Sequence, residues 1–160
     1  MGSGKTALFG AGCFWGVEEA FLRVNGVLLT EAGYMGGSLE NPRYEDVCTG
    51  RTGHAEVVRV RYDPDVVRYE DLLDLFWSIH DPTQYNRQGP DVGTNYRSVI
   101  FYTDKDQEAL ARASKDRLIK SGRYTAPVVT EIVPAREFYK AEEYHQQYFR
   151  KHGGGGCRIR

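Results

Sequence analysis

The chain has 160 residues, a length that suits one domain with a core of its own. Its formal net charge is −1, so no strong field favours nucleic acid or an anionic membrane as a partner. No apolar run comes near the ~20 residues of a membrane-spanning helix, and no signal-peptide stretch opens the chain, so we expect a cytoplasmic protein. The Met-Gly-Ser start leaves open that residues 1–5 are a leader remnant or an added segment.

The first part of the chain predicts three strands and one helix. Residues 6–10 form a short apolar strand, and a helix begins about Gly16 because apolar residues recur from there at helical spacing. An Asn-Gly pair ends that helix. Two further strands are expected over 27–34 and 56–62, and the second of them alternates along its length.

The second part of the chain predicts helices that alternate with strands. Its first helix has one apolar face and one polar face, and Thr103 or Asp104 caps the next one. In chain order the predicted elements are a helix over 69–80, a strand over 98–102, a helix over 104–120, a strand over 128–133 and a helix over 141–151.

This order of elements, β-α-β-β-α-β-α-β-α, predicts an α+β fold. We expect a single domain over 1–160, with helices packed on one face of a mixed, largely antiparallel sheet around a ferredoxin-like core. The loops 36–52 and 81–95 both exceed ~12 residues, which is unusual in a compact domain, and the second contains little that could form regular structure. Residues 153–160 follow as a glycine-rich tail, expected to be flexible, that carries Cys157.

Cys13 is the first candidate for chemistry. It stands at a predicted strand-to-helix junction, where unpaired N–H groups and the positive end of the helix dipole favour a thiolate. A lone cysteine is more often a buried structural residue. The flanking Gly12 and Gly16, which permit a tight turn and close approach by a substrate, and the apolar wall of Phe14 and Trp15 favour a functional role instead.

Glu56 is the second candidate. Side chains alternate along a strand, so Glu56 shares a face with Val58 and Val60 and is expected to be buried with them. A buried carboxyl without a cation keeps its proton to higher pH, which suits a general acid at neutral pH. The alternative is a glutamate at the end of a strand that reaches solvent.

Two tyrosines and two further cysteines complete the set. Tyr34 and Tyr96 stand where a strand meets a glycine-rich loop, so their hydroxyls could point into a cleft. Cys157 follows four glycines, and a mobile tail could bring its thiol to a sulfenic acid on another cysteine. The alternative for Cys157 is an incidental thiol at a frayed terminus. Cys48 is interpreted as a spectator, with a resolving role as the second choice.

Four blocks of the sequence together resemble one enzyme family. Gly-Cys-Phe-Trp-Gly at 12–16 is similar to the signature pentapeptide of the A-type peptide-methionine sulfoxide reductases. The other blocks follow in that family's order: Gly-Tyr-Met-Gly-Gly at 33–37, Thr-Gly-His-Ala-Glu-Val-Val at 52–58, and Asn-Arg-Gln-Gly-Pro-Asp-Val-Gly at 86–93 with Tyr-Arg-Ser at 96–98. The resemblance covers nearly the whole chain, and its blocks are specific because they occur together and in order.

The resemblance implies a role for each residue of the catalytic group. Cys13 attacks the sulfur of a methionine S-sulfoxide, and Glu56 gives a proton to the sulfoxide oxygen. Tyr34 and Tyr96 hydrogen-bond that oxygen, and Asp91 helps to order the site. Thiolate attack on a sulfoxide needs such an acid, because an unprotonated oxygen is a poor leaving group.

Substrate binding and recycling are implied in the same way. Phe14 and Trp15, which follow Gly12, bind the methyl group of methionine sulfoxide, free or in oxidised proteins. The sulfenic acid on Cys13 passes to a disulfide with Cys157, which thioredoxin reduces. Neither a metal nor an organic cofactor is implied, the cysteines and histidines show no metal-ligand spacing, and a monomer is expected.

The sequence departs from the family's pattern at two points, and two other functions are alternatives to the reductase. Asn95 stands where the family usually has glutamine, and a single tail cysteine, where some members carry two, indicates a one-step relay. A thiol peroxidase or peroxide sensor would use the same two cysteines, but it has no evident use for the wall of Phe14 and Trp15. A non-enzymatic module that captures methionine in this aromatic pocket would bind independently of its thiols.

Overall fold

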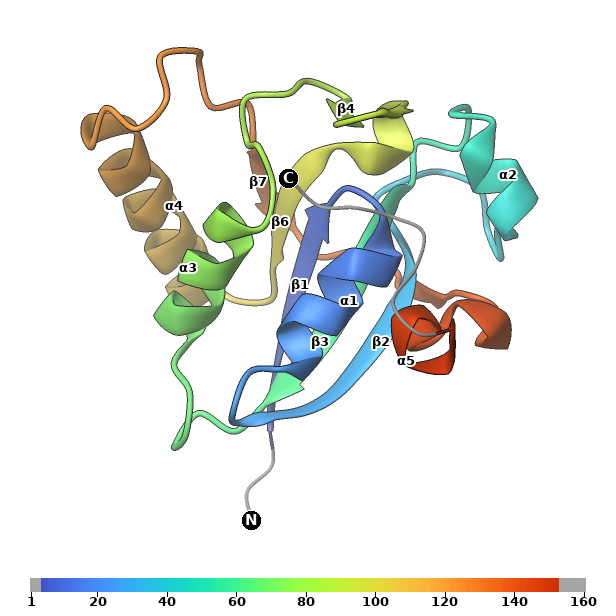
Figure 1. The fold of residues 1–160 in the computed structure, drawn as a ribbon, viewed down its shortest axis with the longest axis horizontal. Coiled ribbons are helices and arrows are strands. Elements are labelled where there is room, and N and C mark those ends of the chain that lie inside the picture. The colour runs from blue at the N-terminus through green and yellow to red at the C-terminus, as the bar shows by residue number, and fades with distance from the viewer. Residues whose placement is uncertain (1–3, 153–160) are drawn as a thin grey trace.

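One sheet organises the computed structural model, which describes residues 4–152 (Figure 1). Its strands are β1 (Lys5–Ala11), β2 (Val27–Met35), β3 (Ala55–Tyr62), β6 (Ser98–Tyr102), β7 (Glu131–Pro134) and β8 (Tyr139–Lys140). They lie in the order β7-β6-β1-β3-β2-β8, and neighbours are antiparallel except for the parallel pair β6 and β7. The predicted α+β fold with a mixed, largely antiparallel sheet is therefore confirmed.

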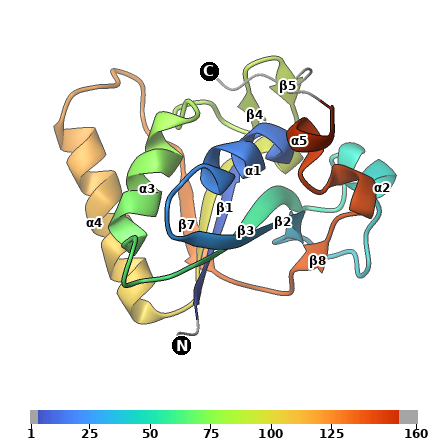
Figure 2. The same cartoon turned by 60° about the horizontal axis from the view of Figure 1, so that its bottom comes forward.

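Three helices of the described chain cover one face of this sheet, namely α1 (Phe14–Leu22), α3 (Tyr69–Ser78) and α4 (Lys105–Lys120) (Figure 2). Alternation along β3 explains the two-sided packing: Val58 and Val60 join the core beneath the helices, and Val57 joins a smaller cluster on the opposite face, where Phe138 packs against it. The strand β3 lies between β1 and β2, which is compatible with the ferredoxin-like interpretation.

The predicted strands agree closely with the observed ones. The strand predicted over 98–102 has the bounds of β6. The last predicted strand, over 128–133, begins later than expected, at Glu131. Its first residues leave the sheet because the Val129 N–H donates to the carbonyl of Pro82 at 2.9 Å.

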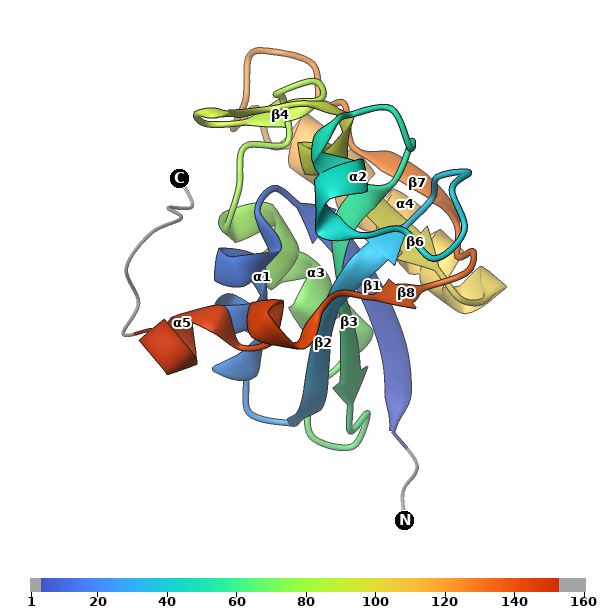
Figure 3. The same ribbon diagram turned by 90° about the vertical axis from the view of Figure 1, so that its right-hand side faces the viewer.

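The two long loops contain short elements, including the loop 81–95, where we expected little regular structure. The first loop contains α2 (Tyr44–Cys48), and the second contains the hairpin of β4 (Arg87–Gln88) and β5 (Asp91–Val92), followed by a 3₁₀ turn over Thr94–Tyr96. Strands of two residues are too short for an alternating pattern to reveal them. Both loops lie at the end of the sheet where β1 leads into α1 (Figures 1 and 3).

The helix predicted over 141–151 was also wrong. The chain forms a 3₁₀ turn over Glu143–His145 and then α5 (Tyr148–His152). A positive φ of 52° at Gln147 separates the two. The side chain of Gln146 accepts a hydrogen bond from the Ala32 N–H and donates to the Ala32 carbonyl. These bonds hold the segment against β2, and a continuous helix over 141–151 would not follow this path.

Candidate active site

Cys13 joins β1 to α1 and occupies the N-cap position of the helix, so the predicted strand-to-helix junction is confirmed. The residue is half-buried, and its carbonyl accepts the backbone N–H of Val17 at 3.5 Å. The first turn of a helix leaves N–H groups without intrahelical partners, and the helix dipole adds partial positive charge there. This position favours a thiolate at Cys13.

Gly12 allows the β4–β5 hairpin to approach Cys13. Its φ is +98°, and a Cβ at this position would lie 2.9 Å from side-chain atoms of Gln88. The side chain of Gln88 is itself tied to the backbone N–H and carbonyl of Asp81. Glycine is therefore required at position 12 both for the backbone conformation and for the packing of the hairpin.

Glu56 is buried on the helix-covered face of β3, where only 2% of it is exposed, as its alternation with the valines predicts. The backbone N–H of Phe14 donates to its Oε1 at 3.1 Å, which brings the carboxyl next to Cys13. Burial, with a smaller contribution from the charge of Asp91, raises the pKa of Glu56 to about 8 against the opposing hydrogen bonds of Phe14 and Asn95. The carboxyl is therefore protonated at neutral pH and suited to act as a general acid.

Asn95 is a site residue that the sequence did not reveal as one. Its side chain is buried and hydrogen-bonds to the carboxyl of Glu56. Gly93 makes room for it, because a Cβ at that glycine would lie 2.5 Å from the Asn95 Oδ1. The signal that could have identified it is its position directly before Tyr96, at the place where the family usually has the longer amide.

Tyr34 and Tyr96 lie near Glu56 on different elements. Tyr34 is the cross-strand partner of Glu56 in the pairing of β2 with β3, and its hydroxyl donates to Glu142 Oε1 at 2.9 Å. Tyr96 ends the 3₁₀ turn after the hairpin. Burial is the largest cause that raises the pKa of both phenols. The hydrogen bond to Glu142 follows for Tyr34 and the charge of Glu56 for Tyr96, so both hydroxyls keep their protons.

Asp91 reaches the same region from β5 and is half-buried. Burial raises the pKa of its carboxyl, and its charge acts on both Glu56 and Tyr96. The second long loop thus delivers Asp91, Asn95 and Tyr96 to the end of the sheet where Cys13 lies.

Phe14 and Trp15 belong to an aromatic cluster at the start of α1. The ring of Phe14 is buried, and its centroid lies 5.7 Å from that of Tyr34. The half-buried Trp15 stacks on Tyr148, with ring centroids 3.8 Å apart and planes 7° apart. Its indole N–H donates to Nδ1 of His145 at 2.9 Å. His145 stands 130 residues along the chain from Trp15, so nothing in the local sequence pattern indicated this contact.

Of the two other cysteines, the structure describes Cys48. Cys48 ends α2 at the surface, and the Tyr44 hydroxyl hydrogen-bonds to its thiol. Partial burial of the thiol, together with the charges of Glu56 and other acidic neighbours, raises the pKa of Cys48, which makes it a weak nucleophile at neutral pH. This supports its interpretation as a spectator. Cys157 lies outside the described residues.

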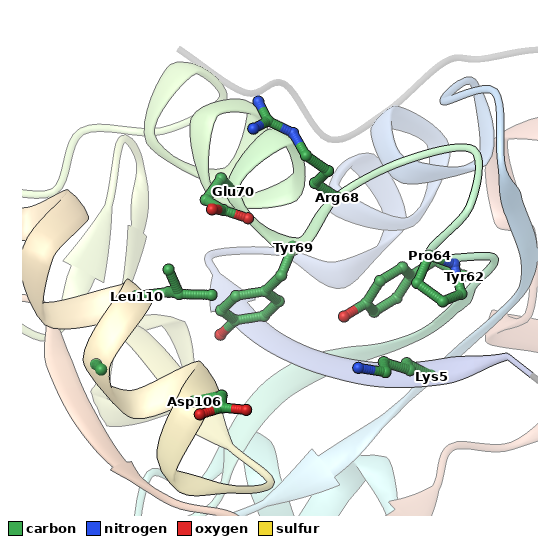
Figure 4. A pocket seen from close by; sticks show the side chains of 9 residues that line it. Lys5, Tyr62, Pro64, Arg68, Tyr69, Glu70, Asp106 and Leu110 are labelled. Carbon is green, nitrogen blue, oxygen red and sulfur yellow. The ribbon is translucent and has the colours of Figure 1, made fainter.

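Residues 4–152 contain neither a candidate metal site nor a membrane-spanning helix. No three or more His, Cys, Asp or Glu side chains in that range are grouped so as to hold a metal ion, and none of its helices is long and apolar enough to cross a bilayer. A hollow of about 400 Å³ lies at the far end of β1 from Cys13 (Figure 4). Lys5, Arg68 and Asp106, among others, give it charges of both signs, and none of the candidate catalytic residues lines it.

Comparisons with known proteins identify the family of this chain. A family model described as peptide methionine sulfoxide reductase matches residues 5–160. Peptide methionine sulfoxide reductase MsrA of Methanoculleus marisnigri is 66% identical over 155 residues, which are 97% of this chain and 94% of that protein. The crystal structure of reduced Mxr1 from Saccharomyces cerevisiae is similar with a TM-score of 0.90 and 35% identity, over 97% of this chain and 89% of the other.

The same yeast protein has also been solved in complex with Trx2, and that structure is similar with a TM-score of 0.62 and 26% identity, over 98% of this chain and 87% of the other. The family match includes both the strand-to-helix junction at Cys13 and the end of the chain that holds Cys157. The chain belongs to the peptide methionine sulfoxide reductase family.

Proposed function

We propose that this chain reduces methionine S-sulfoxide to methionine, with Cys13 as the nucleophile and Glu56 as the acid. The observation that carries the proposal is the hydrogen bond from the Phe14 N–H to Glu56, which holds a protonated carboxyl beside the cysteine. A hydrogen bond or a proton given to the sulfoxide oxygen makes the sulfur more reactive toward a thiolate, and this pair supplies both the thiol and the acid.

In the reductase step the Cys13 thiolate attacks the sulfoxide sulfur while Glu56 gives its proton to the oxygen. The hydroxyl then passes from the substrate sulfur to Cys13 Sγ, as the substrate S–O bond and the new bond between the two sulfurs break. Methionine leaves, and Cys13 becomes a sulfenic acid. The substrate sulfur gains two electrons, Cys13 loses two, and Glu56 regains its proton from solvent. Tyr34 and Tyr96 are proposed to hydrogen-bond the oxygen as its charge develops, in the manner of an oxyanion hole.

Phe14 and Trp15 are proposed to bind the substrate methyl group beside Gly12. The aromatic cluster around them supports this role, since burying one methyl group in an apolar pocket contributes about 1 kcal/mol. Asp91 is proposed to order the site, because its charge helps to keep Glu56 protonated.

Recycling is proposed to begin with Cys157. Its thiol attacks the sulfur of the sulfenic acid on Cys13, a disulfide forms and water leaves. A dithiol of thioredoxin then reduces the disulfide by exchange. The likeness to Mxr1, which has been crystallised with Trx2, supports this choice of reductant. All electrons come from thiols, so no prosthetic group takes part.

The compartment, the oligomeric state and the form of the substrate are also proposed. A cycle that runs on free thiols suits a reducing compartment, for which we propose the cytoplasm. We further propose that the chain works as a monomer, that 1–160 form one catalytic domain, and that methionine sulfoxide is accepted both free and in oxidised proteins.

An epimer-resolved assay tests the proposal. Reduction of the S and R epimers of methionine sulfoxide is measured with dithiothreitol and with thioredoxin, for the wild type, Cys13→Ser and the matched control Cys48→Ser. We expect turnover of the S epimer alone, its loss in Cys13→Ser and its retention in Cys48→Ser. Activity in Cys13→Ser, or faster turnover of hydrogen peroxide than of the sulfoxide, would reject the proposal.

A further inference from the structure

The segment 141–147 is fixed beside the active site by bonds at its C-terminal end. The Gln146 side chain bonds both the N–H and the carbonyl of Ala32 on β2, at 2.8 and 2.9 Å. The backbone N–H of Gln147 donates to Glu18 Oε1 on α1 at 2.8 Å. Figure 3 shows this part of the chain passing beside β2 and α1. His145, the residue before this anchor, is therefore held at a defined place next to Trp15.

The His145 ring makes one hydrogen bond within the described part of the chain, and its partner is Trp15. An indole N–H can only donate, so the Nδ1 that receives it at 2.9 Å is unprotonated and the neutral ring carries its proton on Nε2. Nε2 is buried and has no partner among residues 4–152. An unpaired buried N–H is unfavourable, so the Nε2 side of the ring does not stabilise the fold. The hydrogen bond that His145 contributes is the one it accepts at Nδ1.

The surroundings keep the ring neutral. His145 is fully buried, and burial lowers its pKa, although the charges of Glu142 and Glu45 act in the opposite direction. The rings nearest to it, with centroids within 5.2 Å, are those of Phe14, Tyr44 and Tyr144. A neutral imidazole in an aromatic setting can accept the indole N–H, whereas an imidazolium has only donors.

Two contacts together determine where the indole of Trp15 lies. Stacking on Tyr148 fixes the plane of the indole, because the two rings are only 7° from parallel. Stacking alone leaves the indole able to slide over the face of the Tyr148 ring. The hydrogen bond from Nε1 to His145 opposes this shift and fixes the Nε1 edge of the indole on His145.

We propose that His145 is a positioning residue for the reductase step, which as the neutral Nε2–H tautomer orients the Trp15 indole toward the substrate methyl group. The inference rests on the proposed function, in which Trp15 binds that methyl group. His145 touches no reacting atom in this role and acts through Trp15.

The hydrogen bond itself can be tested in the full chain without any activity. His145→Phe keeps a ring but removes the acceptor, and His145→Asn places an amide oxygen close to the position of Nδ1. In a ¹H–¹⁵N spectrum we expect the Trp15 indole proton to exchange with solvent about tenfold faster in His145→Phe, and within about threefold of the wild type in His145→Asn. The other indole, Trp77, donates to Ser114 at 2.7 Å and serves as the internal control, because its peak should not move.

Single-turnover kinetics then separate binding from chemistry. For His145→Phe we expect the S-sulfoxide concentration at half-maximal rate to rise about tenfold, the lower end of the range for a lost contact in an apolar pocket, while the maximal rate falls less than about threefold. His145→Asn should restore the wild-type value. A residue with a merely structural role would not show this split or this rescue.

A pH profile provides a second readout. As pH falls through the lowered pKa of His145, Nδ1 becomes protonated and can no longer accept, so the half-saturating concentration of the wild type should rise. Glu142 and Glu45, with the phenols of Tyr44 and Tyr144, are the titratable groups around the ring. His145→Asn retains all four of these groups. If the half-saturating concentration of this variant does not rise at low pH, the rise in the wild type is due to His145.

Suppose that the wild type is active and that His145→Phe changes neither the half-saturating concentration nor the Trp15 peak. This result would overturn the inference about His145 and leave the proposed function standing. A wild type that reduces no methionine sulfoxide would overturn the proposed function and this inference with it, even if the Trp15 peak shifts as expected.

Discussion

Replacing Glu56 by glutamine is expected to stabilise the folded chain at neutral pH and to leave its stability almost unchanged at acid pH. The side chain is buried, and it accepts a hydrogen bond from the Phe14 N–H. Glutamine can accept the same bond through its carbonyl and can donate as the protonated carboxyl does. The two side chains differ mainly in that glutamate can ionise and glutamine cannot.

The magnitude follows from the pKa of Glu56, which burial raises from 4.5 to about 8 in the folded chain. Below pH 4.5 the carboxyl is protonated in both the folded and the unfolded chain, so folding costs nothing extra. As pH rises from there to about 8, the unfolded chain releases the proton while the folded chain retains it, and stability falls. At about 1.4 kcal/mol for each pH unit, the fold has lost about 3 kcal/mol by pH ~7.

Urea unfolding of the wild type and Glu56→Gln at pH ~4.5 and pH ~7 measures this difference. We expect the variant to gain about 3 kcal/mol on the wild type between the two pH values. Glu40→Gln is the matched control, because Glu40 is exposed and its replacement removes one negative charge without touching the site. An equal difference between wild type and Glu56→Gln at both pH values would refute the reasoning, since it would mean that Glu56 ionises in the folded chain as it does in the unfolded one.

The remaining predictions concern the acid, the relay and the hairpin. Glu56→Gln should keep most of the single-turnover rate at pH ~7, because its amide still donates a hydrogen bond, and Glu56→Ala should lose about 100-fold; equal rates for Ala and the wild type would exclude an acid role. With thioredoxin, Cys157→Ser should stop after about one turnover and Cys48→Ser should cycle normally; undiminished cycling of the first would exclude the tail relay. Gly12→Ala should lower the free energy of unfolding by about 3 kcal/mol, and Gly122→Ala, with a positive φ and nothing near its Cβ, by about 1 kcal/mol. Equal losses in urea unfolding would show that the contact with the hairpin contributes nothing.

The sequence predicts those parts of the site that local patterns determine. Alternation along β3 is sufficient to place Glu56 among buried valines, because a strand gives each residue a fixed face. The junction at Cys13 follows from an apolar run that changes to helical spacing at a glycine. Both features depend on neighbours within a few residues, and both are confirmed.

The missed parts depend on contacts between distant segments. Asn95 acts on a strand about 40 residues earlier, and His145 reaches Trp15 across 130 residues. The incorrect prediction of a helix over 141–151 has the same origin. Gln146 bonds to Ala32, 114 residues away, and helix propensities do not include a hydrogen bond to so distant a residue. Periodicity reports which face of an element is apolar, but it does not report which polar side chain another strand will bind.

The pairing of Tyr34 with Glu142 restricts how the oxygen side of the site can work. Tyr34 has one hydroxyl proton, and it is donated to a carboxylate that also accepts the Tyr44 N–H at 2.9 Å. One proton cannot serve this carboxylate and a sulfoxide oxygen equally well, so the proposed role of Tyr34 requires it to exchange one partner for the other when substrate binds. Glu56 differs, because its protein neighbours donate to it and leave its own proton available. In the proposed step Glu56 is therefore the better proton source, whereas Tyr34 gives up its hydrogen bond to Glu142 in order to hydrogen-bond the substrate oxygen.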